Sequence, residues 1–437
     1  MPAPTLLKPS VFQWSALALL TISVGINYLD RGNLSVALSH IQRDIHLDEH
    51  RLGLLSGAFF VTYSLFQIAA GKLIDRFNVN WVYAVGYLLW SGATAATGVT
   101  RNVTFWRVTL DSFAVLFALR LILGAGESVA YPAYSKIISG SFPEGLRGTA
   151  NAAIDAGSKI GPALGVMIGV ELVKWLDWRR MFIAIGIASM LWLVPWCFVA
   201  PRLKLRQELS PITPPTYGEI VSKRAFWGTV LGLFGGNYTW YLLLTWLPYY
   251  FEKARHYEQS QLAIFSSLPF WGVATASMLA GLAADAVIRR GAVGARVRQA
   301  TVSVGLAGCC LFMLPGVIIR NETVSLTLLI VACVCLGGFS SNHWALSQTL
   351  AGPEAAGKWT GIQNCLGNFA GVAAPWITGS ILNRTQSFPI AFAVSCVFLL
   401  VGIGGYWLVI GKTTRVHWST EAGSVSGNPP KKQAAKA

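Results

Sequence analysis

The chain has 437 residues, of which 54% are hydrophobic and 12% are charged, and its mean hydropathy is +0.52. Soluble domains average roughly 25% charged residues, so this composition excludes an ordinary soluble protein and favours an integral membrane protein. The net charge of +15 does not indicate nucleic-acid binding, because the lysines and arginines are spread over the polar connections and the C-terminal end.

Long apolar segments recur along the whole chain. A membrane-spanning helix needs about 20 apolar residues, whereas the strands of a membrane barrel would alternate in polarity, which these segments do not. The sequence therefore predicts an all-α membrane protein with twelve transmembrane helices in two pseudo-symmetric six-helix bundles. The predicted spans are residues 14–38, 52–71, 80–98, 109–139, 146–173, 181–200, 226–250, 260–284, 299–318, 324–350, 357–381 and 388–411.

A long polar connection at residues 201–224 divides the predicted spans into two sets of six. We expect an N-terminal bundle at residues 12–200, a cytoplasmic linker at 201–224 and a C-terminal bundle at 225–412. Residues 413–437 are rich in glycine, proline and lysine and predict a disordered cytoplasmic tail. Because lysine and arginine are more numerous on the connections that share a side with both ends, we expect both termini in the cytoplasm.

Short motifs recur in the two predicted bundles at a constant offset. Two glycines four residues apart allow helices to approach closely, and a repeat of this kind indicates two related halves. The corresponding positions are Gly71 with Gly281, Asp75 with Asp285, Gly157 with Gly367, and Gly161 with Gly371.

Charged residues inside the predicted spans are the main candidates for function, because a charge at bilayer depth survives only beside a cavity or a partner. Asp30 and Arg31 adjoin in the first span. Neighbours on a helix point about 100° apart, so we expect Asp30 to face Arg120 and Arg31 to face the cavity. Arg120 and Glu127 share one face of the fourth span, as a protonatable carboxylate tuned by a cation or as a structural ion pair.

Two six-helix halves and the loop Gly71-x-x-x-Asp75-Arg76 resemble the major facilitator superfamily, whose substrates bind near the membrane midplane between the halves. This resemblance implies that the loop and its repeat form gates on the cytoplasmic side. The basic run that usually follows the loop is reduced here to residues 77–80, so we expect a weaker gate. The implied gating residues are Gly71, Asp75, Arg76, Gly281 and Asp285.

The segment 27–35, with Arg120, Gly126-Glu127 and Tyr131-Pro132, is more specifically similar to the anion:cation symporters. These are bacterial proton-coupled carriers of organic acids, including D-galactonate and hexuronates. The resemblance implies that Asp30 and Glu127 carry protons, assisted by Arg120, and that Arg31 binds the substrate carboxylate.

Several polar and aromatic residues on other spans match positions at which the anion:cation symporters contact their substrates. A sugar acid needs many such groups, because each buried hydroxyl must be hydrogen-bonded. An interhelical hydrogen bond or an aromatic core contact remains the alternative for each residue by itself. The implied substrate-binding residues are Tyr28, Tyr63, Asn237, Tyr241, Ser341, Trp344 and Asn364.

Two features depart from the pattern of this family. Asp155 and Lys159 are spaced i,i+4 in the fifth span; they predict either an intrahelical ion pair or a second cation for a dicarboxylate. His343 in the tenth span either titrates near neutral pH or is a neutral, hydrogen-bonded histidine.

The sequence predicts neither an enzyme nor a cofactor or metal site, since no P-loop, nucleophile elbow or metal-ligand spacing occurs. We expect a monomer in the bacterial inner membrane that imports an organic anion together with protons by alternating access. The favoured substrate is a sugar acid, namely a hexuronate, aldonate or aldarate. Alternatives are a carrier of aromatic or dicarboxylic acids of the phthalate type, an exporter, and a transport-dead membrane sensor.

Overall fold

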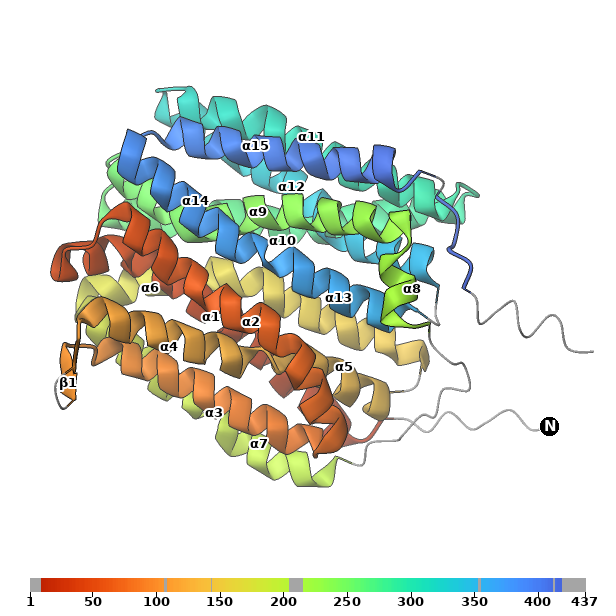
Figure 1. The fold of residues 1–437 in the computed structure, drawn as a ribbon, viewed down its shortest axis with the longest axis horizontal. Coiled ribbons are helices and arrows are strands. Elements are labelled where there is room, and N and C mark those ends of the chain that lie inside the picture. Colours follow the sequence, from red (N-terminus) through yellow and green to blue (C-terminus); the bar gives the residue numbers. More distant parts are fainter. Residues whose placement is uncertain are drawn as a thin grey trace, which may run out of the picture.

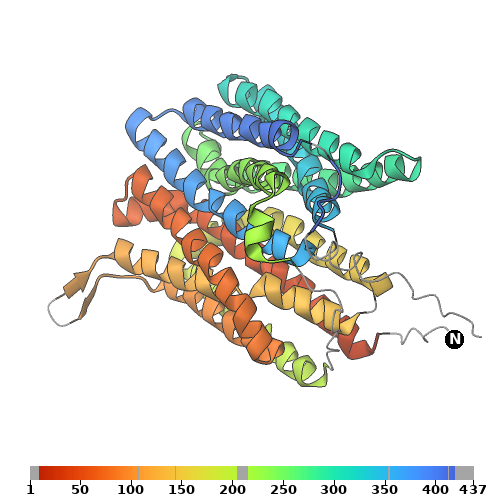
Figure 2. The same ribbon diagram turned by 45° about the vertical axis from the view of Figure 1, so that its right-hand side comes forward.

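The computed structural model describes residues 9–105, 108–142, 144–203, 215–352, 355–411 and 413–418. Of the predicted linker and tail, residues 204–214 and 419–437 lie outside the described part. Long helices running in roughly one direction form the molecule (Figures 1 and 2). A short antiparallel hairpin of β1 (Val103–Phe105) and β2 (Val108–Leu110) pairs Val103 with Leu110.

The N-terminal part of the chain begins with three long helices and ends with a short turn of 3-10 helix. Its elements are α1 (Val11–Ile45), α2 (Glu49–Arg76), α3 (Val79–Gly98), α4 (Ser112–Glu127), α5 (Ala130–Ser141), α6 (Glu144–Met190), α7 (Leu193–Val199) and η1 (Ala200–Arg202).

The C-terminal part contains the short α8 and then seven longer helices. Its elements are α8 (Tyr217–Val221), α9 (Arg224–Lys253), α10 (Gln259–Arg289), α11 (Gly294–Ile318), α12 (Glu322–Ala351), α13 (Ala356–Asn368), α14 (Ala370–Thr385), α15 (Phe388–Gly404) and η2 (Gly405–Val409).

Four breaks interrupt the helical segments. Asp177 has a φ of 65° inside α6 and so divides this segment into two helices. Its carboxylate accepts hydrogen bonds from the backbone N–H of Arg179 at 2.8 Å and of Arg180 at 3.0 Å, as an N-cap residue does. The other breaks lie between α4 and α5, between α6 and α7, and between α13 and α14 at Phe369.

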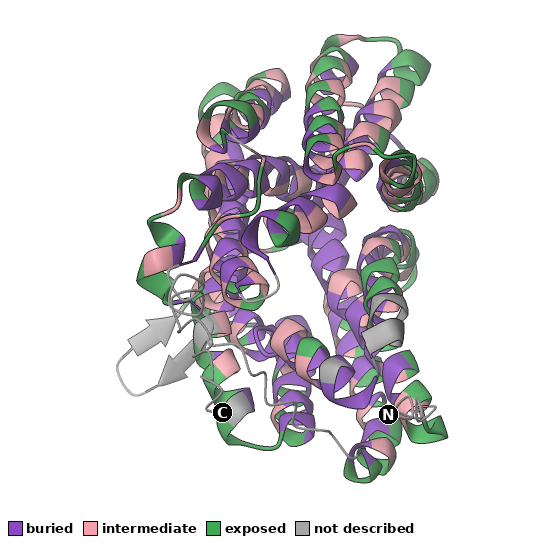
Figure 3. Cartoon of the chain, turned by 90° about the vertical axis from the view of Figure 1, so that its right-hand side faces the viewer, coloured by how far each residue is buried: buried purple, intermediate pink, exposed green. Residues whose placement is uncertain are grey.

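Eight stretches of the described residues are long and apolar enough to cross a membrane. They are Val11–Ile45, Ser112–Ile138, Ala150–Arg202, Gln261–Arg289, Gly294–Ile318, Glu322–Ala351, Ala356–Thr385 and Phe388–Val409. Large apolar side chains such as Leu88, Met278, Leu311 and Leu408 are exposed, and Figure 3 shows exposed residues around the outside of the helix assembly and buried residues within it. An apolar exterior suits contact with lipid, so this is an all-helical membrane protein.

The helices pack in two groups that meet along a few pairs. In the first group α1 packs on α6, and α4 packs on α2 and α3; in the second, α11 and α10 pack on α12, and α9 packs on α15. The groups meet where α2 contacts α14, α6 contacts α10 and α1 contacts α9. Figure 1 shows α2 lying beside α14.

The two ends of the contact between the groups differ. At the end that carries the α1–α2 turn, a Cβ at Gly53 would overlap the carbonyl of Pro375, and a Cβ at Gly379 would overlap the carbonyl of Glu49. At this end Tyr249 also donates a hydrogen bond to Gln42 Oε1 at 2.9 Å. We call this the closed end.

The opposite end, at which α2 finishes and α13 begins, is loosely packed. An added Cβ at Gly71, Gly357 or Gly361 would meet nothing within 4 Å among the described residues. We call this the open end. The molecule therefore has its two groups of helices in tight contact at the closed end and apart at the open end.

Candidate functional site

Four charged residues from α1 and α4 gather in the buried centre of the first group of helices. The residues Asp30, Arg31, Arg120 and Glu127 have exposed fractions of 1%, 9%, 4% and 0%. All residues from Asp30 to Ser39 on α1 are buried, because α1 packs against both α6 and α9. The structure thus brings together the four residues that the sequence singles out for proton coupling and anion binding.

Glu127 is paired with Arg31. The Arg31 Nη2 and Nε atoms donate hydrogen bonds to Glu127 Oε2 at 2.9 and 3.2 Å. The expected arrangement had Glu127 beside Arg120 and Arg31 facing the cavity, so the observed partner differs from the one that helix periodicity suggested. Periodicity within α4 places Arg120 and Glu127 on one face, but the packing of α1 on α4 decides which cation reaches the carboxylate.

Aromatic rings surround the guanidinium of Arg31. Its Cζ atom lies 4.6 Å from the centre of the Tyr28 ring, and 4.8 Å from the ring centres of both Phe59 and Tyr63. Such cation–π contacts stabilise a desolvated cation by about 2 kcal/mol or more. The rings hold the Arg31 guanidinium in place beside Glu127.

Asp30 and Arg120 have fewer partners. Thr94 donates a hydrogen bond to Asp30 Oδ2 at 3.5 Å, and the Arg120 guanidinium lies 5.8 Å from the ring of Phe182. No ion pair joins Asp30 to Arg120 among the described residues, although the two charges act on each other. Asp30 Oδ1, Arg120 Nη2 and Glu127 Oε1 are buried without a hydrogen-bond partner in the described part of the chain. Other buried polar atoms of the described residues also lack partners, but only these three belong to charged side chains. Burying a charge costs far more than burying a neutral polar group, which favours a chemical role for this cluster and not only a packing role.

A small cavity of about 30 Å³ adjoins the cluster on the side of the closed end. Its polar lining comes from Arg31, Ser35, Ser56, Arg120 and Thr245. A space of this size holds one water molecule. Both arginines of the cluster line it, and neither carboxylate does.

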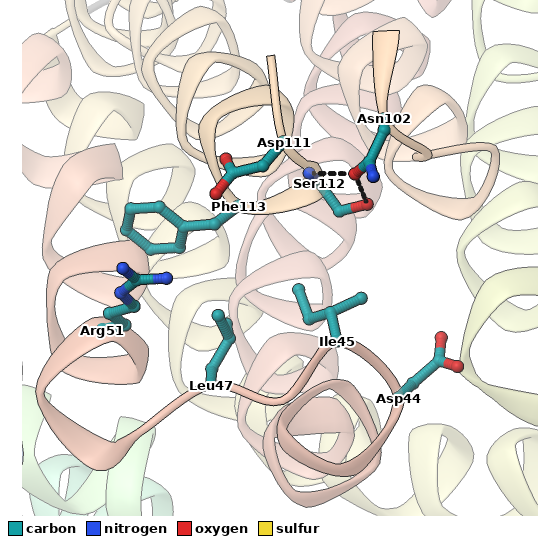
Figure 4. A pocket seen from close by; sticks show the side chains of 8 residues that line it. All are labelled: Asp44, Ile45, Leu47, Arg51, Asn102, Asp111, Ser112 and Phe113. Carbon is teal, nitrogen blue, oxygen red and sulfur yellow. Dashed lines mark hydrogen bonds between the residues drawn. The ribbon is translucent and has the colours of Figure 1, made fainter. Parts of the chain in front are cut away.

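A larger cavity of about 330 Å³ lies at the closed end, away from the charged cluster. It is lined by Asp44, Ile45, Leu47, Arg51, Asn102, Asp111, Ser112 and Phe113 (Figure 4). Asn102 Oδ1 accepts hydrogen bonds from the backbone N–H and the hydroxyl of Ser112 at 2.9 and 3.0 Å. None of the residues predicted for the substrate site lines this cavity.

Three of the predicted substrate-binding residues, Tyr28, Tyr63 and Tyr241, gather around Arg31. Tyr63 stacks on Phe59 at 5.2 Å, and the ring centres of Phe60 and Tyr241 are 4.2 Å apart. Tyr28 contacts Arg31 directly, and its hydroxyl lies 3.3 Å from that of Tyr131. The site is therefore an aromatic pocket with hydroxyl groups at its edge.

Two of the predicted residues make contacts near this pocket. Asn364 donates a hydrogen bond to Gln67 Oε1 at 3.2 Å across the two groups of helices, and Asn237 donates one to the carbonyl of Gly367 at 3.2 Å. Ser341 and Trp344 are engaged elsewhere: Ser341 donates to the carbonyl of Ser277 at 2.9 Å, and Trp344 packs edge-on to His343.

Several site residues were not predicted from the sequence. Phe59 and Phe60 contact Arg31, and Asn368 accepts a hydrogen bond from the Tyr241 hydroxyl at 2.5 Å. The i,i+4 spacing of Phe59 and Tyr63 could have indicated an aromatic stripe on α2. Nothing local distinguishes Asn368, whose partner lies 127 positions away.

His343 lies in a separate, neutral network. It is completely buried, and its Nδ1 lies 2.6 Å from the hydroxyl of Tyr406. Gln363 Nε2 lies 2.7 Å from His343 Nε2 and donates to Ser347 Oγ at 3.0 Å. Because an amide nitrogen can only donate, Nε2 of the histidine accepts and the proton sits on Nδ1. The structure favours the neutral, hydrogen-bonded histidine over the titrating one.

Asp155 and Lys159 are not paired with each other in the described structure. Asp155 is exposed, and the Lys159 ammonium lies 5.7 Å from the ring centre of Trp240 on α9. The intrahelical ion pair that the i,i+4 spacing suggests is absent from the ion pairs of the described residues.

The predicted gating residues lie at the open end. Gly71 has open space around it, and Gly281 approaches Ser341 on α12. Asp285 accepts a hydrogen bond from Arg298 Nη2 at 2.9 Å, which ties the end of α10 to α11. The side chain of Asp75 lies outside the described residues, and Arg76 is exposed.

Known structures share this architecture. A bacterial homologue of the human lysosomal transporter Spinster, in its inward-facing and occupied conformation, aligns with a TM-score of 0.78. The alignment covers 92% of this chain and 97% of that protein at 17% identity, a likeness that concerns the fold alone. The two proteins thus share one arrangement of helices.

A model of the Major Facilitator Superfamily matches residues 20–375, and the chain belongs to this family of transporters, which are not enzymes. A D-galactonate transporter of Escherichia coli O6:H1 is 26% identical over 94% of this chain and 98% of its own length. A probable galactarate/D-glucarate transporter of Bacillus subtilis is 26% identical over 94% of each chain. These relatives are members of the anion:cation symporter family.

Proposed function

We propose that the protein is a proton-coupled symporter that imports an organic anion, with a sugar acid as its substrate. The observation that carries this proposal is the buried pair of Arg31 and Glu127 within the aromatic pocket. Arg31 can bind the carboxylate of a substrate, and Glu127, which holds Arg31, can be neutralised by a proton. This arrangement couples the two events.

The coupling follows from competition for one guanidinium. While Glu127 is ionised it holds Arg31, and removing one partner from a buried ion pair costs about 3–5 kcal/mol. Protonation of Glu127 removes the attraction and leaves Arg31 in need of another anion. A substrate carboxylate supplies it, so proton binding and anion binding favour each other, as linked equilibria must.

Asp30 provides a second proton site in this proposal. It is buried beside the positive charge of Arg120 and has one weak hydrogen bond, from Thr94. Two carboxylates within one buried cluster repel each other when both are ionised. We therefore assign one proton to Asp30 and one to Glu127 in each transport cycle.

The lining of the pocket suits a polyhydroxylated acid. Tyr28, Tyr63 and Tyr241 offer hydroxyl groups near Arg31, and Asn364 and Gln67 offer amide groups between the two groups of helices. Sugar hydroxyls need such partners when buried. The relatives that transport galactonate and galactarate or glucarate support the same class of substrate.

We further propose twelve transmembrane helices. The eight apolar stretches do not include the long helices α2, α3 and α9, and the stretch Ala150–Arg202 bends at Asp177. With the bent stretch counted as two helices and these three helices added, the eight stretches become twelve transmembrane helices. We assign six to a bundle at residues 12–200 and six to a bundle at residues 225–412. With both termini in the cytoplasm of a bacterial cell, the open end faces inward. We expect a monomer in the inner membrane.

Uptake into proteoliposomes tests this function. An inwardly directed proton gradient should drive accumulation of radiolabelled D-galactonate or D-glucarate above the external concentration, and a protonophore should abolish it. The Arg31→Ala variant should accumulate neither. Accumulation that follows a sodium gradient and ignores pH would contradict the proposal.

A further inference from the structure

Among the described residues, Lys159 is the one lysine or arginine deep within the helices that the mechanism above leaves unused. It lies near the middle of the first part of α6 and is half-buried. A charge at bilayer depth is costly unless it faces a cavity or a partner. Its closest recorded contact among the described residues is the Trp240 ring, at 5.7 Å, which stabilises an ammonium without neutralising its charge.

The packing of α6 determines the direction in which Lys159 points. A stripe of glycines on α6 packs against α1; it consists of Gly157, Gly161 and Gly165. A Cβ added at Gly161 would contact Gly25 and Tyr28, and a Cβ added at Gly165 would contact Leu29. Lys159 lies two residues from both Gly157 and Gly161, so it points about 160–200° away from this stripe. It therefore faces the second group of helices, where α9 carries Trp240.

The contacts of α9 connect Lys159 to the surroundings of Arg31. Trp240 adjoins Tyr241, whose ring contacts that of Phe60 at 4.2 Å, and Phe60 in turn lies 5.8 Å from the Arg31 guanidinium. The two cations thus border the same segment of α9 from the first group of helices. One belongs to α1 and the other to α6.

The distance between Lys159 and Arg31 along the helix axes follows from the register between α1 and α6. Since Gly161 lies at the level of Gly25 and Tyr28, and Gly165 at the level of Leu29, the helices are parallel and Lys159 lies about six to eight residues before Arg31. At 1.5 Å per residue this is roughly 10 Å along the helices, with Lys159 nearer the open end. Because Lys159 points away from α1, the width of α6 adds to this separation, and the two flexible side chains offset part of it.

We infer that Lys159 is a second anion-binding residue of the substrate site, and that the transported anion carries two acidic groups at opposite ends of a chain-like molecule. One group binds Arg31 and the other binds Lys159. The spacing disfavours anions whose acidic groups sit on adjacent carbons, such as phthalate. This inference rests on the proposed function, because it assigns the second group of a substrate whose first group Arg31 holds.

Binding of matched anions to the purified full-length protein tests the inference. D-Glucarate and D-gluconate differ in one terminal carboxylate, as do adipate and 6-hydroxyhexanoate. Calorimetry should show the dianion binding at least tenfold more tightly in at least one of these pairs. Phthalate should have no such advantage over benzoate.

Variants of Lys159 test whether this residue causes the preference for the dianion. Lys159→Gln should remove the preference for the dianion while changing the affinity for the monoanion by less than threefold, and Lys159→Arg should retain it. Lys174→Gln is the matched control, because Lys174 lies 5.8 Å from the Trp175 ring on the same helix but is exposed near the closed end. It should leave both affinities unchanged.

The outcomes separate this inference from the proposed function. If anions bind and Arg31→Ala abolishes their binding, but the dianion and monoanion bind equally, the role of Lys159 is refuted and the proposed function stands. A dianion preference that persists in Lys159→Gln, or that occurs only for phthalate, refutes it too. If no anion in any pair binds, both proposals fail.

Discussion

The two groups of helices each bury a polar network, and the networks differ in charge. The network of α1 and α4 contains two carboxylates and two guanidinium groups, with a single ion pair and three buried polar atoms without partners among the described residues. The network of α12 and α13 contains His343, Ser347 and Gln363, all neutral. His343 is hydrogen-bonded to Tyr406 and Gln363, and Gln363 to Ser347; of these residues only Gln363 has a buried atom without a partner in the described part of the chain, its Oε1.

This difference indicates a division of labour between the groups. Neutral, hydrogen-bonded networks specify packing and resist rearrangement, whereas charges with incomplete partners respond to protons and anions. We therefore expect the response to the proton gradient to depend on the first group of helices, and the second group to supply neutral contacts and a surface against which the first one moves.

The largest effect should follow the loss of Arg31. Arg31→Ala removes the guanidinium that both Glu127 and the substrate require, so the affinity for the anion should fall by about 30-fold or more, the equivalent of the 2–5 kcal/mol that a truncated buried charge pair costs. Arg31→Lys should recover little of it, because an ammonium lacks the planar fork that suits a carboxylate. Calorimetry checks both variants, with a monodisperse elution profile as the control for folding. An unchanged affinity of Arg31→Ala for the anion would contradict the functional difference between the charged and the neutral network.

Neutralising Glu127 should separate binding from accumulation. Glu127→Gln resembles the protonated acid, so this variant should bind the anion and exchange it across the membrane but fail to concentrate it against a gradient. Counterflow and concentrative uptake in proteoliposomes measure the two activities. Glu171→Gln, which changes an exposed glutamate on α6, is the matched control and should concentrate substrate normally. If Glu127→Gln did the same, Glu127 would be structural.

The net charge that crosses the membrane in each transport cycle tests the assignment of two protons. With one proton each on Asp30 and Glu127, a cycle that carries a monoanion moves one net positive charge, and a cycle that carries a dianion moves none. A membrane potential of 100 mV should then add about 2.3 kcal/mol to the accumulation of a monoanion and nothing to that of a dianion. Currents on a solid-supported membrane test this, and a current-free monoanion cycle would reduce the proton count to one.

The smallest effect on coupling should come from the neutral network. His343→Gln breaks the contacts to Tyr406 and Gln363 and leaves buried polar atoms unpaired, which costs about 1–3 kcal/mol of stability. The melting temperature should fall, while the dependence of uptake on the pH gradient should match that of the unmodified protein. An altered proton dependence would show that the second group of helices takes part in coupling.

The sequence predicted the helices well and their ends less well. The span expected at 14–38 is a helix from Val11 to Ile45, because Ser10 caps its N-terminus and the polar residues beyond 38 continue the same hydrogen-bonding pattern. Hydropathy registers only the apolar part of such a helix. The turn at Asp177 fell between two predicted spans, as expected of a polar residue that caps a new helix.

The sequence identified the charged residues of the site but not their pairing. A charged residue in an apolar segment can be recognised from the sequence alone. The partner of Glu127, however, is 96 positions away in the chain and is determined by the packing of α1 against α4. The same holds for Lys159, whose i,i+4 neighbour Asp155 suggested a pair within one helix. The structure instead has its ammonium beside Trp240 of the other group of helices.

Proton uptake on substrate binding tests the central claim most directly. In weakly buffered detergent solution with a pH indicator, addition of the anion should make the protein take up protons, and its affinity should rise as the pH falls, because the complex holds more protons than the free protein. Glu127→Gln should take up one proton fewer and lose that part of the pH dependence. Equal proton uptake by both proteins, or none by either, would contradict the coupling of Glu127 to Arg31.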